Sequence, residues 1–319
     1  MDKSFSGKGW GLVGIAALIL LFLLPAFLPR FYIYLISLML VYGLLATSLN
    51  VVLGYGGVFQ FHHCVFYGIG AYATALFLTK TGAPFVVSFI AGGAAAAVLS
   101  FLMGLITVRL SKLYFGMLQI SLGSLVWAIV YRWYDFTGGD DGIHGISLPD
   151  IISSQKGAYY FTLIVTLISL FIIYKIIKSP FGSVLQGIRD NPVRSGMVGI
   201  NVKRHILAAL IIAGFFGGVA GSLFVVVDHT VFPDMLFWTL SLEVLIMCLL
   251  GGWFNFFGPM LGAAIVIALR TFVSGYTVYW ALVYGVVMIF VIFFLPDGVL
   301  GYLQEKLQPA KGKAVTKEG

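Results

Sequence analysis

The sequence predicts an all-α integral membrane protein, a polytopic bundle of about ten transmembrane helices whose N- and C-termini face the cytoplasm. Hydrophobic residues make up 60% of the chain and charged residues only 10%, whereas soluble domains have about 45–50% apolar and about 25% charged residues. Mean hydropathy is +1.03. The apolar runs are about twenty residues long and do not alternate with polar positions, as helices that cross about 30 Å of hydrocarbon require. A membrane barrel would instead show alternating strands of about ten residues.

Apolar runs separated by polar breaks define the predicted spans. The third and eighth runs are short, and each adjoins a Gly-rich stretch. The first run is too long for the apolar region of a signal peptide and lacks a small-residue cleavage site, so no cleavable signal peptide is expected. The predicted spans lie near residues 10–29, 31–53, 65–80, 84–107, 114–134, 159–177, 205–227, 235–250, 257–273 and 277–296.

The distribution of Lys and Arg predicts the orientation, because cytoplasmic loops carry an excess of these residues. The side of the termini would hold Lys3, Lys8, Arg109, Lys112, Lys175, Lys178, Arg189, Arg194, Lys203, Arg204, Lys306, Lys311, Lys313 and Lys317. The opposite side would hold Arg30, Lys80, Arg132, Lys156 and Arg270. We therefore predict cytoplasmic tails at 1–9 and 301–319 on either side of a transmembrane domain at 10–300.

An outer loop is predicted at 135–158, where Gly138, Gly139, Gly142 and Gly145 indicate a turn-rich surface segment that could cover a pore mouth.

A longer inner loop is predicted at 178–204. Pro180 and Gly182 are expected to end the preceding helix. Asn191 and Pro192 then have the residue types of an N-cap and a first helical position, and Gly199 would end this short helix. A short capped helix flanked by cations is suited to docking a partner; an ordinary connecting loop is the alternative.

The segment Ser48–Tyr72 combines glycines with polar residues at membrane depth. A broken helix in a membrane is tolerated where it is buried in protein or lines a cavity, and transporters use such segments to present polar groups to solutes. A tight turn with interfacial histidines is the alternative. Adjacent histidines diverge on a helix, so no metal site is predicted. The candidate pathway residues here are Asn50, Gly54, Gly56, Gly57, Gln60, His62 and His63.

Glu243 is the one carboxylate well inside an apolar run. A charge at that depth costs about 2.5–3.5 kcal/mol on insertion scales, so the side chain should face the bundle and have a partner, for which Arg270 and Ser241 are candidates. A structural lock and a pathway residue are equally compatible with it.

Small residues predict close helix packing at 213–222, where Gly214 and Gly218, and Gly217 and Gly221, are four residues apart. At 251–263, paired glycines and a Gly-Pro predict one helix ending and another beginning. Cys64 and Cys248 lie in apolar surroundings and are expected to be packing residues.

Several function classes are excluded by missing motifs. No GxxxxGK[ST] phosphate loop, GxSxG or HExxH occurs, so the chain is not expected to be an enzyme or to hold a cofactor, and any ATP hydrolysis belongs to another polypeptide. No basic stripe with interleaved aromatic residues indicates nucleic-acid binding.

Four stretches, in order along the chain, resemble the permeases of branched-chain amino acid ABC importers, and the LivM-type subunit most of all. They are SLNVVLGYGG…GIGAY (48–72), TGGDDGIHGI (137–146), RDNPVRSGMVGINVKR (189–204) and EVLIMCLLGG…GPMLGA (243–263). The resemblance covers most of residues 40–300. Urea, short-chain amide and aromatic-acid importers share this pattern, so it indicates the type of transporter better than the solute that is transported.

The resemblance implies a multi-pass subunit of the bacterial inner membrane that works by alternating access. A second, related permease subunit would pack beside it, two cytosolic ATP-binding subunits would dock below, and a periplasmic solute-binding protein would deliver the solute. The inner loop would be the ATPase-coupling segment, through Arg189, Asp190, Asn191, Arg194, Gly199 and Asn201.

One stretch departs from the family pattern. The family commonly has Ser-Leu-Gly-His-Ala where this chain has Gln60, Phe61, His62, His63 and Cys64. Only His63 matches, which puts aliphatic amino acids in doubt as cargo and indicates a more polar or aromatic solute. An ion-coupled secondary transporter is the alternative of another class, although Glu243 alone makes a weak case for it; a passive channel would need no basic coupling loop.

Overall fold

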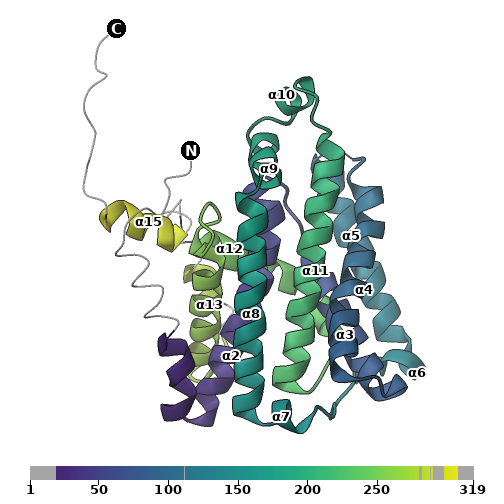
Figure 1. Cartoon of the computed structure of the whole chain (residues 1–319), viewed down its shortest axis with the longest axis vertical. Coiled ribbons are helices and arrows are strands. Elements are labelled where there is room, and N and C mark those ends of the chain that lie inside the picture. Colours follow the sequence, from purple (N-terminus) through teal and green to yellow (C-terminus); the bar gives the residue numbers. More distant parts are fainter. Residues whose placement is uncertain (1–18, 111, 280–281, 288, 290–297, 308–319) are drawn as a thin grey trace.

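The computed structural model describes residues 19–110, 112–279, 282–287, 289 and 298–307 as a helical bundle (Figure 1). Within these residues, five helices are long and apolar enough to cross a membrane. They are Arg30–Tyr55, Phe85–Thr107, Tyr114–Arg132, Gln155–Lys178 and Val202–Asp228. An all-helical membrane architecture is what the apolar composition predicts.

Helix bounds agree with most predicted spans to within a few residues. In chain order the elements are α2 (Arg30–Asn50), the π-helical turn η1 (Val51–Tyr55), α3 (His63–Leu76), η2 (Phe77–Thr81), α4 (Phe85–Thr107), α5 (Lys112–Arg132), α6 (Tyr134–Thr137), α7 (Asp150–Ser153), α8 (Gln155–Lys178), α9 (Pro180–Asp190), α10 (Pro192–Met197), α11 (Val202–Asp228), η3 (Pro233–Leu236), α12 (Trp238–Gly251), α13 (Gly258–Ser274) and α15 (Gly298–Leu307).

The two outermost predicted spans are described only in part. Residues 19–27 are helical, and so are residues 282–287. Residues 10–18 of the first span and half of the last span lie outside the described residues, as do the N-terminal tail and residues 308–319 of the C-terminal tail.

The two ends of the bundle differ. One end carries α9 and α10, and the other carries α6 and α7 (Figure 1). We call them the α10 end and the α7 end. The predicted inner loop therefore lies at one end and the predicted outer loop at the other.

Helix α2 lies at the centre of the bundle. Its most apolar stretch is 83% buried, against 28% for α4 and for α5. It packs against α8, α11, α12 and α13, whereas α3, α4 and α11 form a second group of mutually packed helices. α11 belongs to both groups and is 78% buried. These two helices therefore form the protein interior, and α4 and α5 leave much of their apolar surface for lipid or for another subunit.

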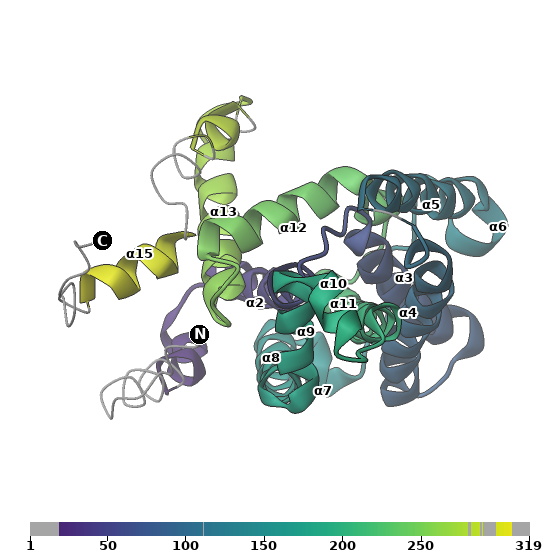
Figure 2. The same ribbon diagram turned by 90° about the horizontal axis from the view of Figure 1, so that it is seen from above.

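The predicted break at 251–263 is confirmed. α12 ends at Gly251, and α13 begins at Gly258 with Pro259 in its first turn. Seen from above, α12 runs across the bundle from beside α5 to α13 (Figure 2). It carries Ser241 and Glu243 into the interior beside α2 and α3.

The prediction that Pro180 and Gly182 end a helix was only half right. α8 ends at Lys178, but Pro180 is the first residue of another helix, α9, within which Gly182 lies. Proline is well tolerated at a first helical position, where its missing N–H would have had no partner. The inner loop therefore contains two helices, α9 and α10, of which the sequence predicts only α10.

Candidate functional site

The chain reverses direction between α2 and α3. At the α10 end, η1 is followed by Gly56 and by Gly57, whose φ of 67° is in the left-handed region that glycine tolerates. Residues 57–60 are not helical, and α3 begins only at His63. His63 Nε2 lies 2.8 Å from Ser48 Oγ, two turns before the end of the α2–η1 helix. The segment 56–62 therefore runs back into the bundle, as a broken helix lining the interior would.

Polar side chains gather where this segment meets α2 and α5. His63 lies between two of them, because its Nδ1 is 3.1 Å from Gln60 Oε1 and its Nε2 contacts Ser48. Gln119 of α5 accepts a hydrogen bond from the Phe61 backbone N–H at 3.1 Å. His62 faces Gly123, one turn further along α5. We call Ser48, Gln60, His62, His63 and Gln119 the buried polar cluster.

The buried polar cluster is closed to solvent and has unused hydrogen-bonding capacity. Gln60, His63 and Gln119 are 0% exposed and His62 is 2% exposed. Within the described part of the chain, the side-chain nitrogens of Gln60 and Gln119 have no hydrogen-bond partner. A buried amide without a partner costs about 1–3 kcal/mol, and native proteins satisfy most such groups. This cluster can therefore offer N–H donors to a polar molecule that enters it.

The departure from the family pattern falls inside this cluster. Gln60 provides the acceptor for His63, and His62 occupies the space that Gly123 leaves. Cys64 takes no part, since it points into the apolar core while its backbone N–H donates to Ser241 Oγ at 3.0 Å. Ser48 and Gln119 belong to the cluster but are not among the predicted pathway residues. Ser48 opens the segment 48–72 that the sequence analysis describes, whereas no motif marks Gln119, and both contacts depend on how the chain returns from the break.

The remaining predicted pathway residues lie elsewhere. Asn50 is fully buried and sits against Gly54, at the α10 end of α2. Gly54, Gly56 and Gly57 form the turn there and are outside the polar cluster. The structure thus brings together Gln60, His62 and His63, and separates them from Asn50 and the glycines.

Glu243 forms a third, separate group. Its Oε1 lies 3.5 Å from Arg270 Nη1, and this ion pair joins α12 to α13. The Glu243 side chain is 13% exposed and that of Arg270 is 45% exposed. Arg270 is one of the two predicted partners. The other, Ser241, instead accepts a hydrogen bond from the Cys64 backbone N–H.

Helix α10 has the predicted capping. Asn191 Oδ1 accepts the Arg194 backbone N–H at 2.9 Å, Pro192 is the first helical residue, and Gly199 follows with a φ of 90°. Asn201 caps α11 in the same way by accepting the Arg204 N–H at 3.1 Å. These caps hold the loop in a defined shape at the α10 end.

Apolar side chains protrude from this same loop. Val193, Met197 and Val198 are 66%, 82% and 77% exposed. We call them the α10 knob. Arg194 lies between them on the same short helix and is also exposed. Arg189 and Asp190 instead pair with one another at 3.1 Å at the end of α9.

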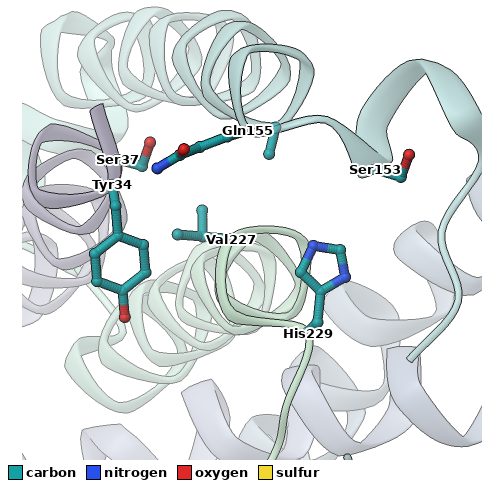
Figure 3. Close-up of a pocket in the computed structure, with 7 residues that line it drawn as sticks. Tyr34, Ser37, Ser153, Gln155, Val227 and His229 are labelled. Atoms are coloured by element: carbon teal, nitrogen blue, oxygen red, sulfur yellow. The ribbon is translucent and has the colours of Figure 1, made fainter. Parts of the chain in front are cut away.

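The α7 end contains a cavity of about 200 Å³ between α2, α8 and α11, lined by Tyr34, Ser37, Ser153, Gln155, Ala158, Val227 and His229 (Figure 3). The Tyr34 hydroxyl donates to Asp228 at 2.7 Å beside it. The neighbouring outer loop has positive φ at all four predicted turn glycines, and its Ile143 pairs with Val231. In that loop, the hydrogen bond from Tyr134 to Asp141 raises the pKa of Tyr134. No sequence motif marks this cavity.

Comparison with known proteins gives consistent results. The family model described as "branched-chain amino acid transport system / permease component" matches residues 31–292. The chain is 26% identical to the high-affinity branched-chain amino acid transport system permease protein LivM of Escherichia coli (strain K12), over 94% of this chain and 77% of that protein. It is 25% identical to the LivM protein of Salmonella typhimurium over the same shares. A probable LivM protein of Methanocaldococcus jannaschii is 27% identical over 50% of this chain and 52% of its own length. No solved structure matches.

Proposed function

Because the chain belongs to the family of branched-chain amino acid transport permeases, we propose that it is the membrane-spanning subunit of an ATP-driven importer. It would move branched-chain amino acids, or a related small polar solute, into the cytoplasm of a bacterium by alternating access. The complex would contain a second related permease subunit, two cytosolic ATP-binding subunits and a periplasmic solute-binding protein.

The α10 knob carries this proposal. Val193, Met197 and Val198 are exposed at the tip of a capped loop, at the end of the bundle rather than on its lipid-facing flank (Figure 1). Apolar side chains gathered on a water-facing surface indicate a protein partner. The flanking Lys203 and Arg204 add positive charge. A short projecting helix of this kind is suited to a groove on an ATPase subunit, whose closure on ATP would push on the bundle.

The charges of the two ends support an α10 end in the cytoplasm. The described cations of the α10 end include Lys178, Arg194 and Lys203, whereas the α7 end has a group of carboxylates. Cytoplasmic segments of membrane proteins have the excess of Lys and Arg. The cavity at the α7 end would then face the periplasm, where the solute-binding protein docks.

The buried polar cluster is the proposed polar section of the solute route. The cluster is closed to solvent in this conformation. This agrees with alternating access, in which the solute route is closed on at least one side of the membrane in every state. Each state has to bind the solute differently for ATP to drive transport. Uncompensated N–H donors on Gln60 and Gln119 give the solute groups to bind once the cluster opens.

The chemistry of the cluster favours a second candidate cargo. Its side chains are amides, imidazoles and a hydroxyl, with no carboxylate, Lys or Arg among them. Neutral donors and acceptors suit urea or a short-chain amide better than an aliphatic side chain, because an apolar group would leave the buried amides unpaired. Substituting Gln60→Ser together with His62→Gly is expected to shift the preference towards aliphatic amino acids.

Uptake of labelled solute by cells that lack the gene tests the proposal. Leucine, urea, a short-chain amide and an aromatic acid are offered to cells complemented with wild type, with Met197→Asp, or with Met197→Leu as control. Met197 is 82% exposed, and Leu keeps an apolar side chain there whereas Asp places a carboxylate in the α10 knob. One solute should enter with wild type and with Met197→Leu, stop on ATP depletion, and enter at least tenfold more slowly with Met197→Asp.

Three outcomes would each contradict a part of the proposal. Uptake that follows the ion gradient and persists without ATP would identify a secondary transporter. Normal transport by Met197→Asp, at matched expression, would show that the knob docks no ATPase. An unchanged substrate profile in the Gln60→Ser, His62→Gly variant would remove the polar cluster from the solute route.

A further inference from the structure

Arg189, the next-to-last residue of α9, lies where three segments distant in sequence meet. Its Nη1 donates to the carbonyl oxygen of Gly54 at 2.8 Å. Its guanidinium carbon is 5.2 Å from the ring centre of Phe254, in the turn between α12 and α13. Its Cβ and Cγ lie against Gly57, where an added Cβ would approach Cγ to 2.6 Å. The side chain is 27% exposed. Arg189 therefore points into the bundle, while the α10 knob of the same loop points out.

The Gly54 carbonyl is a favourable partner for a cation. It belongs to η1, the last turn of the α2–η1 helix, where carbonyl groups have no further helical N–H to accept from and the helix dipole is negative. An Arg also stacks on an aromatic ring in a way that a Lys does not reproduce. A single side chain of α9 thus caps the central helix and is held in place by Phe254.

Contacts continue from this cap towards the buried polar cluster. The Gly54 Cα faces the Trp253 carbonyl, and the Trp253 ring lies 6.0 Å from that of Phe59. Phe59 stacks on Phe61 at 6.4 Å, and the Phe61 N–H bonds Gln119. The segment that connects α2 to α3 therefore has contacts at both ends. Arg189 and the Trp253–Phe254 turn contact it at the α10 end, and the buried polar cluster contacts it at the other end.

This connecting segment has the backbone features of a part of the interior that can change conformation. η1 is a π-helical turn, a form that is rare and that occurs most often at functional sites. Gly57 has positive φ, and residues 57–60 are not helical. A displacement of α9 that pulls on the Gly54 peptide would act on this segment before it acts on regular helices, whose backbone hydrogen bonds resist bending.

We infer that Arg189 is a positioning residue for transport, which ties movement of the α9–α10 loop to the break between α2 and α3 and so to the buried polar cluster. The inference rests on the proposed function. It assigns Arg189 a role inside the permease, in place of the direct ATPase contact that the family resemblance implies. On this inference the ATPase subunit displaces the α10 knob, and Arg189 transmits that displacement from α9 to the Gly54 peptide.

The test uses the complete importer, with all its subunits, in liposomes, and measures solute imported per ATP hydrolysed. Arg189→Gln removes the charge and Phe254→Leu removes the ring. Arg109→Gln and Phe257→Leu are matched controls, because Arg109 is an exposed cation just beyond α4 at the same end, and Phe257 is a half-exposed ring of the same turn. Solute per ATP should fall at least tenfold in Arg189→Gln and about threefold in Phe254→Leu. The ATPase subunits should still bind and hydrolyse ATP, and both controls should match wild type.

Arg189→Lys keeps the charge and provides the measurement if Arg189→Gln does not assemble. Its ratio should lie between those of Arg189→Gln and wild type, because Lys can reach one carbonyl but cannot reproduce the planar stacking. A wild-type ratio in Arg189→Lys and Phe254→Leu would overturn the inference. So would a parallel fall of transport and ATP hydrolysis in proportion to folded protein, the result of a merely structural role. Wild-type transport that needs no ATP would instead overturn the proposed function, so the two failures are distinguishable.

Discussion

Glu243 shows how a charged residue is kept inside an apolar bundle. Its carboxylate lies on α12 and pairs at 3.5 Å with Arg270 of α13, which reaches towards the surface. The sequence predicts Arg270 as one of two candidate partners, because a carboxylate inside an apolar run needs a partner, and the structure selects Arg270 over Ser241. The contact between Ser48 and His63 could not be predicted in this way. It joins two ordinary polar residues through a chain reversal that no local pattern specifies.

Removing one member of the Glu243–Arg270 pair should destabilise the protein more than removing both. Arg270→Gln leaves the carboxylate without its cation and is expected to cost about 1–3 kcal/mol, below the cost of breaking a fully buried pair because Arg270 is half exposed. The double variant Glu243→Gln, Arg270→Gln should recover much of this loss. The apparent Tm in detergent measures both effects, with Arg132→Gln, an exposed cation, as control. Equal Tm values for the single and double variants would mean that the unpaired Glu243 carboxylate carries no cost, and would contradict this prediction.

At the scale of helices, small residues set how closely α3, α4 and α11 approach. A Cβ at Gly221 would overlap the Tyr67 carbonyl oxygen, and one at Gly70 would overlap the backbone of Gly218. Gly92 of α4 similarly faces the Ser222 hydroxyl. The glycine spacing at 213–222 predicts this close packing, and the structure confirms it. Lipid tails are as apolar as leucine, so such packing, rather than the hydrophobic effect, holds membrane helices together.

Gly221→Ala should therefore separate α11 from α3. The added methyl group would meet backbone, which cannot move aside as a flexible side chain can. We expect an apparent Tm lowered by at least 8 °C, or no folded protein. Gly196→Ala is the matched control, since Gly196 is also helical but faces open space. That change should leave Tm unaltered or slightly higher, because Ala favours a helix by about 1 kcal/mol over Gly. Equal Tm values for the two variants would contradict the packing argument.

For the whole molecule, sequence determines the class of fold and most helix bounds but not the arrangement. Composition requires a membrane protein, and helices follow because backbone groups in lipid must be satisfied within each span. The central position of α2, the oblique course of α12 and the existence of α9 were not predicted. A span that is apolar all round carries no stripe to show which neighbour it faces. The sequence does not predict α9, because a proline after an apolar run fits both the end of one helix and the first position of the next, and Pro180 has the second role.

The orientation of the bundle is testable with single cysteines. Met197→Cys and Ile151→Cys place thiols at residues 82% and 86% exposed, at opposite ends. The native Cys64 and Cys248 are 0% exposed and should give little background. A membrane-impermeant maleimide added to intact cells with a permeabilised outer membrane should label Ile151→Cys alone, and inverted vesicles should label Met197→Cys alone. The reverse pattern would invert the orientation and exclude the proposed site of ATPase docking.

The burial of α2 has a consequence for how the protein is made. Among the described elements, α8, α11, α12 and α13 pack extensively against α2, and all four follow it in the order of synthesis. Its buried Thr47, Ser48 and Asn50 therefore enter the membrane before the segments that enclose them exist. The Gly54 carbonyl waits for Arg189, which is translated 135 residues later. Thr47 and Ser48 can donate to carbonyls of their own helix in the meantime, whereas Asn50 and the Gly54 carbonyl have no such partner among the described residues of that helix. We therefore expect this span to depend on the insertion machinery until more than half of the chain has been translated.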